Sequence, residues 1–492
     1  MSLINITNLT FCYDGSYDNI FENTSFQIDT DWKLGFTGRN GRGKTTFFNL
    51  LLGKYEYSGS ISANVDFDYF PYDVKDKSKE TLEILREVGG EFEQWELEIE
   101  LSKLSVDEDV LYRPFETLSN GEQTKVLIAA LFIKSNSFLL IDEPTNHLDI
   151  QAREIVANYL NSKKGFILIS HDRTLLDTCV DHILSINKNS IEVQSGNFSS
   201  WYYNKELQDN FELKKNEKLK KDIKRLDAAA KRNANWSDKV EKSKKGTEPP
   251  TGSIDRGYVG HMAAKMMKRA KSVETRKQRE VEEKEKLLKN IESTESLKLF
   301  PQKYHSNVLA SFEKVSLYYD DKEVCCDVSF TINPGDRIAL QGKNGSGKSS
   351  VLKLLCGEKI KYTGTYSVGS RLIVSYVPQD SSFLKGNLSD FARERGIDES
   401  LFKAILRKLD FSRIQFEKDM SQYSAGQKKK VLIAGSLCEK AHIYVWDEPL
   451  NYIDVLSRIQ IEELLTVYAP TILFVEHDAA FVDNIANKIV KL

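Results

Sequence analysis

Two short glycine-rich stretches in this chain have the composition of phosphate-binding loops. Each follows the pattern Gly-x-x-x-x-Gly-Lys-Ser/Thr, between an apolar run and a helix-favouring run. The glycines let backbone N–H groups approach phosphate oxygens, the lysine supplies a positive charge, and the hydroxyl can bind Mg²⁺. The residues predicted to bind ATP here are Gly38, Gly41, Gly43, Lys44, Thr45 and Thr46 in the first loop, and Gly342, Gly345, Gly347, Lys348, Ser349 and Ser350 in the second.

Two apolar runs, residues 135–141 and 443–446, end in Asp-Glu-Pro. An aspartate at the end of a strand can orient the shell of a Mg²⁺ ion, and the glutamate beside it can polarise an attacking water. We therefore expect Asp142 and Asp447 to join Thr45 and Ser349 around Mg²⁺. The predicted catalytic residues are Glu143 and Glu448, together with two histidines, each after a further apolar strand, that could bond the γ-phosphate: His171 and His477.

A third motif occurs once in each half, before the run that ends in the acidic pair. Ser119 and Gly121 precede a helix expected to begin near Gln123, and Ser424 and Gly426 stand at the matching place in the second half. A serine beside the free N–H groups of a helix start forms an anion site. These four residues are therefore further candidates for binding the phosphates of ATP.

The motifs recur in the same order at a nearly constant distance. The loop lysines, the helix-start serines, the acidic pairs and the histidines of the two halves are separated by 304 to 306 residues. A collinear duplication preserves such spacing. We predict an α/β fold with two tandem P-loop ATPase domains, at 1–201 and 301–492. Strands near 3–6, 25–28, 34–37 and 165–170 and a helix at 47–52 would position the first set of residues.

The segment 202–300 between the two halves differs from both. Residues 214–279 hold 21 lysines and arginines against 8 aspartates and glutamates, although the whole chain carries a net charge of −3. Apolar residues recur at helical spacing over 202–241 and 262–293, so we predict an antiparallel helical hairpin with its tip at about 242–261. A solvated coiled coil would have balanced charge, and this excess favours RNA binding. The predicted RNA-binding residues are Lys242, Lys244, Lys245, Arg256, Tyr258 and His261.

The bulk composition excludes several other classes of protein. Six scattered cysteines include no CxxC pair, so neither a zinc site nor a disulfide scaffold is expected. No basic and apolar leader opens the chain, and no apolar run reaches 18 residues. We expect a cytoplasmic protein that does not cross a membrane.

Together these motifs resemble the ATP-binding-cassette (ABC) superfamily. Leu118–Gln123 is similar to its LSGGQ signature, Asp142-Glu143 to its Walker B motif and His171 to its switch histidine. The resemblance implies that Tyr13 and Tyr319 stack on adenine and that Gln379 is the Q-loop glutamine, near Mg²⁺. The first half departs from the pattern, because Tyr72 replaces that glutamine. The resemblance also implies two composite sites, in which Ser424 and Gly426 face the first phosphate loop and Ser119 and Gly121 face the second.

Two cassettes and a basic linker of about 100 residues resemble the ABC-F family over the full length, and most of all its Lsa-type antibiotic-resistance members. The resemblance implies binding to the large-subunit RNA of the 70S ribosome from the exit-site side, and to P-site tRNA. It also implies loss of bound lincosamides, pleuromutilins and streptogramin A as the linker tip approaches the peptidyl-transferase centre. The resemblance to the Lsa-type members rests on the linker-tip sequence Gly246–Gly260 and on residues 33–44.

Three other classes of protein make different demands on the sequence. A fused importer ATPase predicts a short, uncharged linker and a glutamine in both Q-loops. A DNA-repair or chromosome ATPase predicts far longer coiled coils or a zinc hook. A housekeeping ABC-F translation factor without resistance activity differs only at the linker tip, so that alternative stays open.

Overall fold

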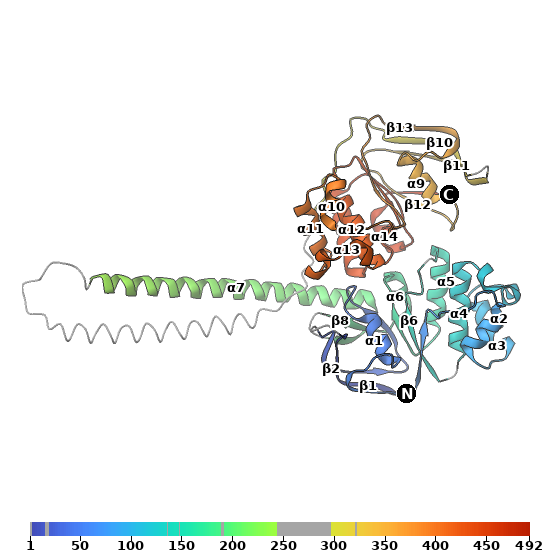
Figure 1. Ribbon diagram of the computed structural model, residues 1–492, viewed down its shortest axis with the longest axis horizontal. Coiled ribbons are helices and arrows are strands. Elements are labelled where there is room, and N and C mark those ends of the chain that lie inside the picture. The colour runs from blue at the N-terminus through green and yellow to red at the C-terminus, as the bar shows by residue number, and fades with distance from the viewer. Residues whose placement is uncertain are drawn as a thin grey trace, which may run out of the picture. The chain divides into compact units, whose positions relative to one another are not determined.

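The computed structural model describes residues 2–14, 19–134, 136–146, 148–187, 191–243, 297–319 and 322–492. The chain divides into two compact units, one of Met1–Trp201 with Thr294–Leu492 and one of Tyr202–Ser293. The first unit contains both predicted ATPase domains, and its duplicated halves are shown in Figure 1.

A six-stranded sheet in the first half carries the candidate catalytic residues at its strand ends. Its order is β5-β6-β7-β3-β8-β9, and all neighbours are parallel except β8 and β9. All four residues of β7 are buried, as expected for parallel strands covered on both faces. The strands are β3 (Lys33–Thr37), β5 (Asp66–Phe70), β6 (Ser137–Asp142), β7 (Phe166–Ile169), β8 (His182–Ile186) and β9 (Ile191–Ser195).

A second, antiparallel sheet of order β2-β1-β4 packs with the first around one core. Its strands are β1 (Leu3–Phe11), β2 (Phe21–Asp29) and β4 (Ser58–Ser62). Ile4, Ile6 and Phe36 are buried in this core together with Phe47 and Phe48 of α1 (Lys44–Leu51). The packing fixes the helix that follows the first phosphate loop against both sheets.

Helices of the first half occupy the stretch between the phosphate loop and the last strands. They are α2 (Thr81–Gly89), α3 (Gln94–Lys103), η1 (Glu108–Tyr112), η2 (Phe115–Thr117), α4 (Asn120–Ile133), α5 (Ile150–Asn161) and α6 (Arg173–Cys179). Two predicted starts need correction: the helix after the phosphate loop begins at Lys44, and the signature helix begins at Asn120 instead of Gln123. Both corrections place the functional loop directly at a helix N-terminus.

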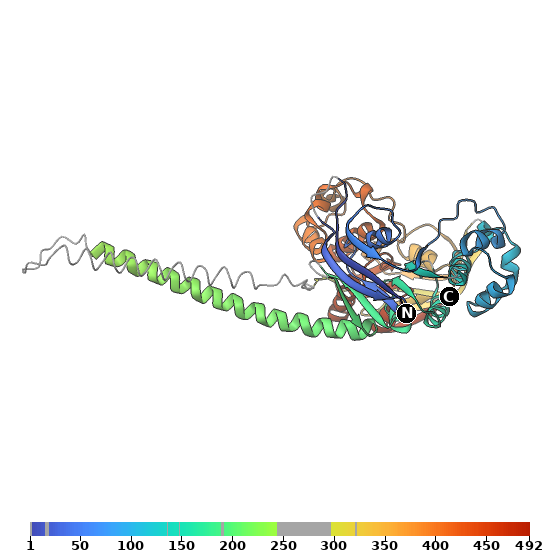
Figure 2. The ribbon, with the colours of Figure 1, turned by 90° about the horizontal axis from the view of Figure 1, so that it is seen from below.

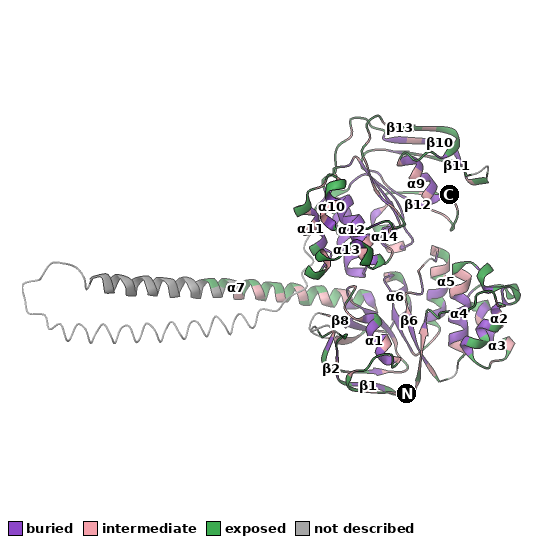
Figure 3. Ribbon diagram, in the orientation of Figure 1, coloured by how far each residue is buried: buried purple, intermediate pink, exposed green. Residues whose placement is uncertain are grey.

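The second half repeats this architecture, with sheets of order β14-β15-β16-β12-β17 and β11-β10-β13. The strands are β10 (Ala310–Tyr319), β11 (Lys322–Ile332), β12 (Arg337–Gln341), β13 (Lys361–Val368), β14 (Val374–Val377), β15 (Ile443–Asp447), β16 (Ile472–Val475) and β17 (Lys488–Lys491). The helices are α9 (Lys348–Leu355), α10 (Leu388–Glu394), α11 (Glu399–Lys408), η3 (Arg413–Glu417), η4 (Met420–Gln422), α12 (Ala425–Cys438), α13 (Val455–Tyr468) and α14 (Ala479–Ile485). The buried interiors of both halves appear in Figure 3.

The predicted first arm of the linker is one continuous helix, α7 (Phe198–Ser243), which Figure 2 shows along its length. Its 46 residues span roughly 70 Å at 1.5 Å per residue. Residues 203–219 are mostly exposed, unlike the cassettes. The predicted second arm, 262–293, lies outside the described residues. Among the helices that the structure describes, none combines the length and apolar character needed to span a membrane.

Candidate functional site: two composite nucleotide sites

The phosphate loops lie between a strand and a helix in both halves, as predicted. Gly43 and Gly347 cap the helices with φ of 96° and 86°, a left-handed conformation that favours glycine. A Cβ on Gly43 would lie 2.5 Å from Ile20 Cγ2, and one on Gly347 2.9 Å from Cys325 Cβ. Both positions therefore require glycine for space as well as for backbone conformation.

The two loop lysines are buried and point back into their own loops. Lys44 Nζ donates to Gly38 O at 2.6 Å, and Lys348 Nζ donates to Gly342 O at 2.9 Å. Burial lowers the pKa of both ammonium groups, although neighbouring carboxylates oppose the shift. The loops thus hold each lysine beside the space where phosphate oxygens would replace the carbonyls.

The acidic strand ends stand next to the loop hydroxyls. Asp142 ends β6, and its Oδ2 accepts a hydrogen bond from Thr45 Oγ1 at 3.1 Å. Asp447 ends β15, where burial raises its pKa to about 6 although the Ser349 side chain bonds to it. Among the described residues its Oδ1 is buried without a hydrogen-bond partner. A carboxylate oxygen left in this state beside a serine hydroxyl fits the oxygen-rich shell of Mg²⁺.

At the second site the catalytic glutamate candidate is surrounded by polar groups. Glu448 Oε2 accepts hydrogen bonds from Gln379 Nε2 at 2.9 Å and Asn451 Nδ2 at 2.6 Å, and its Oε1 lies 3.5 Å from His477 Nε2. Burial alone would raise the pKa of Glu448, but the bond and charge of His477 and the amide of Gln379 lower it to about 2. The carboxylate is therefore ionised and oriented to accept a proton from water.

The first site brings the equivalent glutamate and histidine together. His171 Nε2 lies 3.3 Å from Glu143 Oε1, and the His171 backbone N–H donates to Glu143 Oε2 at 3.4 Å. Burial and the charge of Asp142 raise the pKa of Glu143 to about 8. Burial, Lys44 and Arg458 hold the pKa of His171 well below its usual value.

The signature serines cap their helices as predicted. Ser119 Oγ accepts from Glu122 N at 3.2 Å, and Ser424 Oγ accepts from Gln427 N at 3.3 Å. Each helix also carries the reciprocal side-chain bond of a capping box. The two loops therefore present free backbone N–H groups at a fixed helix start, which is the arrangement an anion site needs.

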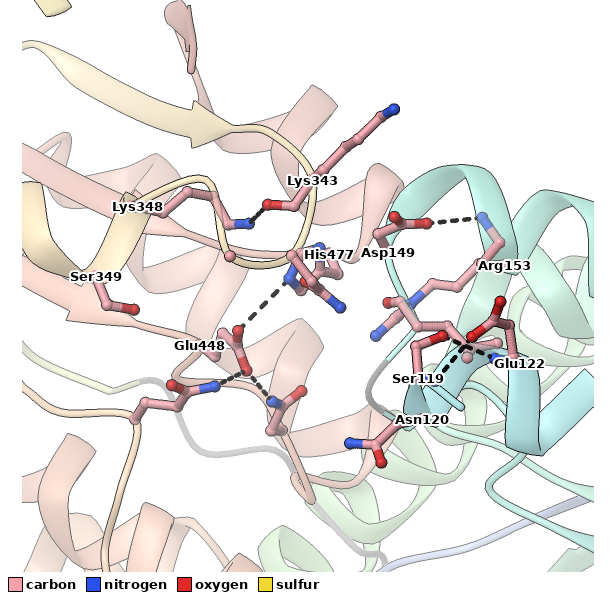
Figure 4. A pocket seen from close by; sticks show the side chains of 18 of the residues that line it. Ser119, Asn120, Glu122, Asp149, Arg153, Lys343, Lys348, Ser349, Glu448 and His477 are labelled. Carbon is pink, nitrogen blue, oxygen red and sulfur yellow. Dashed lines mark hydrogen bonds and ion pairs between the residues drawn. The ribbon is translucent and has the colours of Figure 1, made fainter. Parts of the chain in front are cut away.

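One cavity brings the first signature loop to the second phosphate loop. It has a volume of about 740 Å³ and includes Ser119 and Gly121 on one side and Lys348, Glu448 and His477 on the other. Figure 4 shows Glu448 and His477 directed toward one another, with Ser119 and Asp149 across the cavity from them. Residues of both cassettes therefore line one cavity, and binding of ATP between them stays a prediction.

The first phosphate loop makes direct contacts with the second cassette. Asn40 Nδ2 donates to the backbone oxygen of Tyr452 at 2.8 Å, and Arg42 forms a 3.4 Å ion pair with Asp410. A Cβ on Gly426 would lie 3.2 Å from Asn40 Nδ2 and 2.4 Å from the Tyr452 oxygen. Gly426 of the second signature is therefore next to the first phosphate loop, as predicted.

The aromatic candidates are at the surface near the loops. Tyr13 is 40% exposed, packs edge-on against Phe11 and Tyr55, and shares a 2.8 Å hydrogen bond with Thr46. Tyr319, at the end of β10, is 43% exposed. Stacking of either ring on adenine stays a prediction. Of the predicted RNA-binding residues, Lys242 lies in the last turn of α7, and the other five lie outside the described residues.

Sequence reasoning missed several residues of the site. Asn451 binds Glu448 directly, and Lys430 Nζ forms a buried 2.7 Å ion pair with Asp454. Two arginines, Arg153 and Arg458, bind the aspartates that follow the switch histidines. The repeat distance could have revealed them, because each has an equivalent of similar type 305 residues away in the other half.

Comparisons with known proteins agree with this geometry. A family model described as ABC transporter matches residues 21–146 and 325–451, just over half of the chain. The uncharacterized ABC transporter ATP-binding protein YkpA of Bacillus subtilis (strain 168) is 27% identical over 96% of this chain and 92% of its own. The ribosome protection protein VmlR of the same strain is 25% identical over 99% of this chain and 86% of its own.

Solved structures share the fold. The archaeal ribosome recycling factor aABCE1, in complex with the archaeal ribosomal stalk protein aP1, aligns with a TM-score of 0.62 at 18% identity, covering 98% of this chain and 87% of that one. A chain described as RNase-L Inhibitor aligns with a TM-score of 0.58 at 19% identity, over 93% and 82% of the two chains. The family-model match over more than half of its length shows that the chain belongs to the ABC transporter family, and its two tandem domains are ATPases.

Proposed function

We propose that this protein is an ABC-F ATPase that binds the ribosome and protects it from antibiotics. The observation that carries the proposal is the joining of two complete nucleotide sites by a strongly basic segment that begins as one long helix, α7. A relative that is named a ribosome protection protein aligns with 99% of the chain, the linker included, which supports the same reading.

ATP with Mg²⁺ would bind at both composite sites. Lys44 and Lys348 would contact the β- and γ-phosphates, with Asp142 and Asp447 near the metal and the signature serines approaching from the opposite cassette. Bound Mg²⁺ supplies charge neutralisation for in-line phosphoryl transfer to water. Glu143 and Glu448 would take up the proton of that water. Because each signature belongs to the other cassette, loss of the γ-phosphate removes contacts between the halves and lets them part.

The linker would transmit the nucleotide-dependent movement of the two halves to RNA. A basic rod tracks phosphates along its sides, and a tip at about 242–261 can enter a cleft of folded RNA. We propose that it contacts large-subunit RNA and P-site tRNA from the exit-site side. From there the tip would reach towards the peptidyl-transferase centre and dislodge lincosamides, pleuromutilins and streptogramin A.

A housekeeping translation factor of the same family is the second candidate. YkpA, at 27% identity, is slightly more similar than VmlR at 25%, and its name carries no resistance function. Overall sequence likeness therefore does not separate the two candidates.

Drug susceptibility of a sensitive bacterium tests the proposal. Expression of the intact chain should raise the inhibitory concentration of the three drug classes. Deletion of residues 247–258 should abolish this protection and leave ATPase activity in place. The double variant Glu143→Gln with Glu448→Gln should stay on 70S ribosomes when ATP is present.

The possible outcomes separate the candidates. Stable ribosome binding by the double variant without any protection by the intact chain would favour the housekeeping factor. A double variant that sediments free of ribosomes with ATP present would reject ribosome coupling altogether.

A further inference from the structure

Two equivalent arginines lie just inside the helices that follow the acidic motifs. Arg153 is on α5 and Arg458 is on α13, 305 residues apart. Arg458 is 6% exposed, and the side chain of Arg153 is 12% exposed. A buried guanidinium is costly unless its donors are all used, so the partners of these side chains indicate what they do.

Each arginine binds the aspartate next to the switch histidine of its own cassette. Arg153 Nη1 lies 3.1 Å from Asp172 Oδ2, and Arg458 Nη1 lies 2.9 Å from Asp478 Oδ2. Each aspartate also caps the helix after the histidine, since its other oxygen accepts a backbone N–H at 3.1 Å. Movement of the arginine would therefore move the segment that holds His171 or His477.

The same side chains also hold the loop that reaches the opposite nucleotide site. Arg153 Nε donates to Leu148 O at 3.0 Å, and Leu148 and Asp149 line the cavity that contains Lys348 of the other cassette. Figure 4 shows Asp149 and Arg153 on the side of this cavity that comes from the first cassette.

Arg458 makes the corresponding contacts in the second cassette. Its Nε donates to Ile453 O at 2.9 Å and its Nη2 donates to Leu450 O at 3.0 Å. These two carbonyls flank Tyr452, whose own carbonyl is bound by Asn40 of the first phosphate loop at 2.8 Å.

We propose that Arg153 and Arg458 are positioning residues that couple the two ATP sites. The guanidinium group of each arginine bonds a loop that faces one ATP site and also the aspartate beside the histidine of the other ATP site. Closure of the first site around nucleotide presses on Tyr452, and Arg458 transmits the shift to Asp478 and His477. Arg153 transmits occupancy of the second site to Asp172 and His171 in the same way. Arg458 binds two loop carbonyls and Arg153 binds one, so Arg458 should contribute more of the coupling between the two ATP sites.

The coupling can be measured as a ratio of affinities. In a hydrolysis-deficient Glu143→Gln/Glu448→Gln protein, binding of a fluorescent ATP analogue with Mg²⁺ to the second site is titrated with the first site intact and with Lys44→Ala. The ratio of the two dissociation constants reports how much the first site assists the second. Arg458→Gln should reduce this ratio by about threefold or more, which is the loss expected from roughly one net hydrogen bond. Arg153→Gln should reduce it less.

Two further variants distinguish coupling from general damage to the fold. Arg458→Lys keeps a positive charge near Asp478 but cannot span the carboxylate and both carbonyls, so it should give an intermediate ratio. Arg395→Gln breaks a comparable ion pair, with Glu439 at 3.0 Å, elsewhere in the second cassette and should leave the ratio unchanged. An Arg458→Gln protein that weakens binding equally with and without Lys44, or that keeps the full ratio, would overturn the proposal.

Discussion

At the second nucleotide site Glu448 is bound by three side chains, whereas at the first site Glu143 contacts the side chain and the backbone N–H of His171 in its own cassette. Gln379, Asn451 and His477 surround Glu448, and its pKa falls to about 2. Glu143 has a pKa near 8. Duplication has thus kept the reacting carboxylate in both halves while its surroundings have diverged.

The Q-loops show where this divergence comes from. In the second half Lys429 Nζ donates to Pro378 O at 2.9 Å, which holds the strand end that presents Gln379. The equivalent residues in the first half are Thr124 and Tyr72, and neither can make these contacts. A cavity of about 290 Å³ lies there instead, lined by Tyr72, Thr124 and Asn146, the counterpart of Asn451. The first glutamate therefore has no counterpart of the Gln379 amide, and the contacts that orient it come from His171.

The first site has an ion pair to the opposite cassette that the second site lacks. Arg173, two residues after His171, forms an ion pair with Glu462 on α13 of the second cassette. Both equivalents in the other half are alanines, Ala479 and Ala157, so the second site lacks this bridge. Arg173 thus ties the histidine segment of the first site to the opposite cassette, whereas the carboxylate of the second site is ordered by side chains of its own cassette. The comparison predicts that the second site turns over ATP faster.

Removing each catalytic carboxylate in turn gives the largest expected effect. Glu448→Gln should lower the steady-state rate of phosphate release by about 10²-fold, in the range typical of a lost general base. Glu143→Gln should leave most of the turnover, because the better-oriented site remains. Equal loss in the two single variants would show that the orienting contacts of Glu448 do not determine rate.

Restoring the missing amide tests the cause of the difference. In the Glu448→Gln background, where only the first site hydrolyses ATP, Tyr72→Gln should raise turnover by roughly 3- to 10-fold, as expected from one regained hydrogen bond of about 1 kcal/mol. Tyr72→Phe, which keeps the ring and adds no amide, is the matched control and should leave turnover unchanged. A rise in turnover in the Tyr72→Phe variant would show that the hydroxyl of Tyr72 slows the first site, and not the missing amide that would orient Glu143.

The parts of these sites that depend on a local sequence pattern could be predicted from the sequence alone. A phosphate loop requires glycine, lysine and a hydroxyl at fixed spacing, and an acidic strand end is a contiguous motif, so the strand, loop and helix order followed directly. The 305-residue repeat then predicted the tandem α/β fold, which the structure and the family match confirm. Helix α7 followed from composition, because lysine, glutamate, leucine and alanine favour helix over a long window.

Residues that act through packing could not be predicted in this way. Lys429 and Arg173 look like ordinary surface charges in the sequence, and only the fold brings them to Pro378 and Glu462. The departure at Tyr72 was visible, but its consequence depends on Thr124 and Asn146, which are far from it in the chain. Environment, and not residue type, sets the pKa values of the two glutamates in opposite directions.

The smallest expected effect concerns stability without nucleotide or metal, and it has opposite signs at the two sites. The folded protein keeps the Glu143 proton up to about pH 8, whereas the unfolded chain releases it above about pH 4.5, so stability is lost as the pH rises through this window. In EDTA, Glu143→Gln should therefore raise Tm by a few degrees at pH 8 and change it little at pH 5.

Glu448 should behave in the opposite way, because its lowered pKa means that the ionised form stabilises the fold above about pH 4.5 and that this contribution is lost only as the pH falls towards 2. Glu448→Gln in EDTA should lower Tm at both pH 5 and pH 8, since a neutral amide forfeits the charge-assisted bonds to Gln379, Asn451 and His477. Thermal melts of both variants beside the parent protein measure the two shifts directly. Shifts of the same sign at pH 8 would mean that the two carboxylates share one environment, and the asymmetry of the sites would then have to arise from the cross-cassette bridge of Arg173 alone.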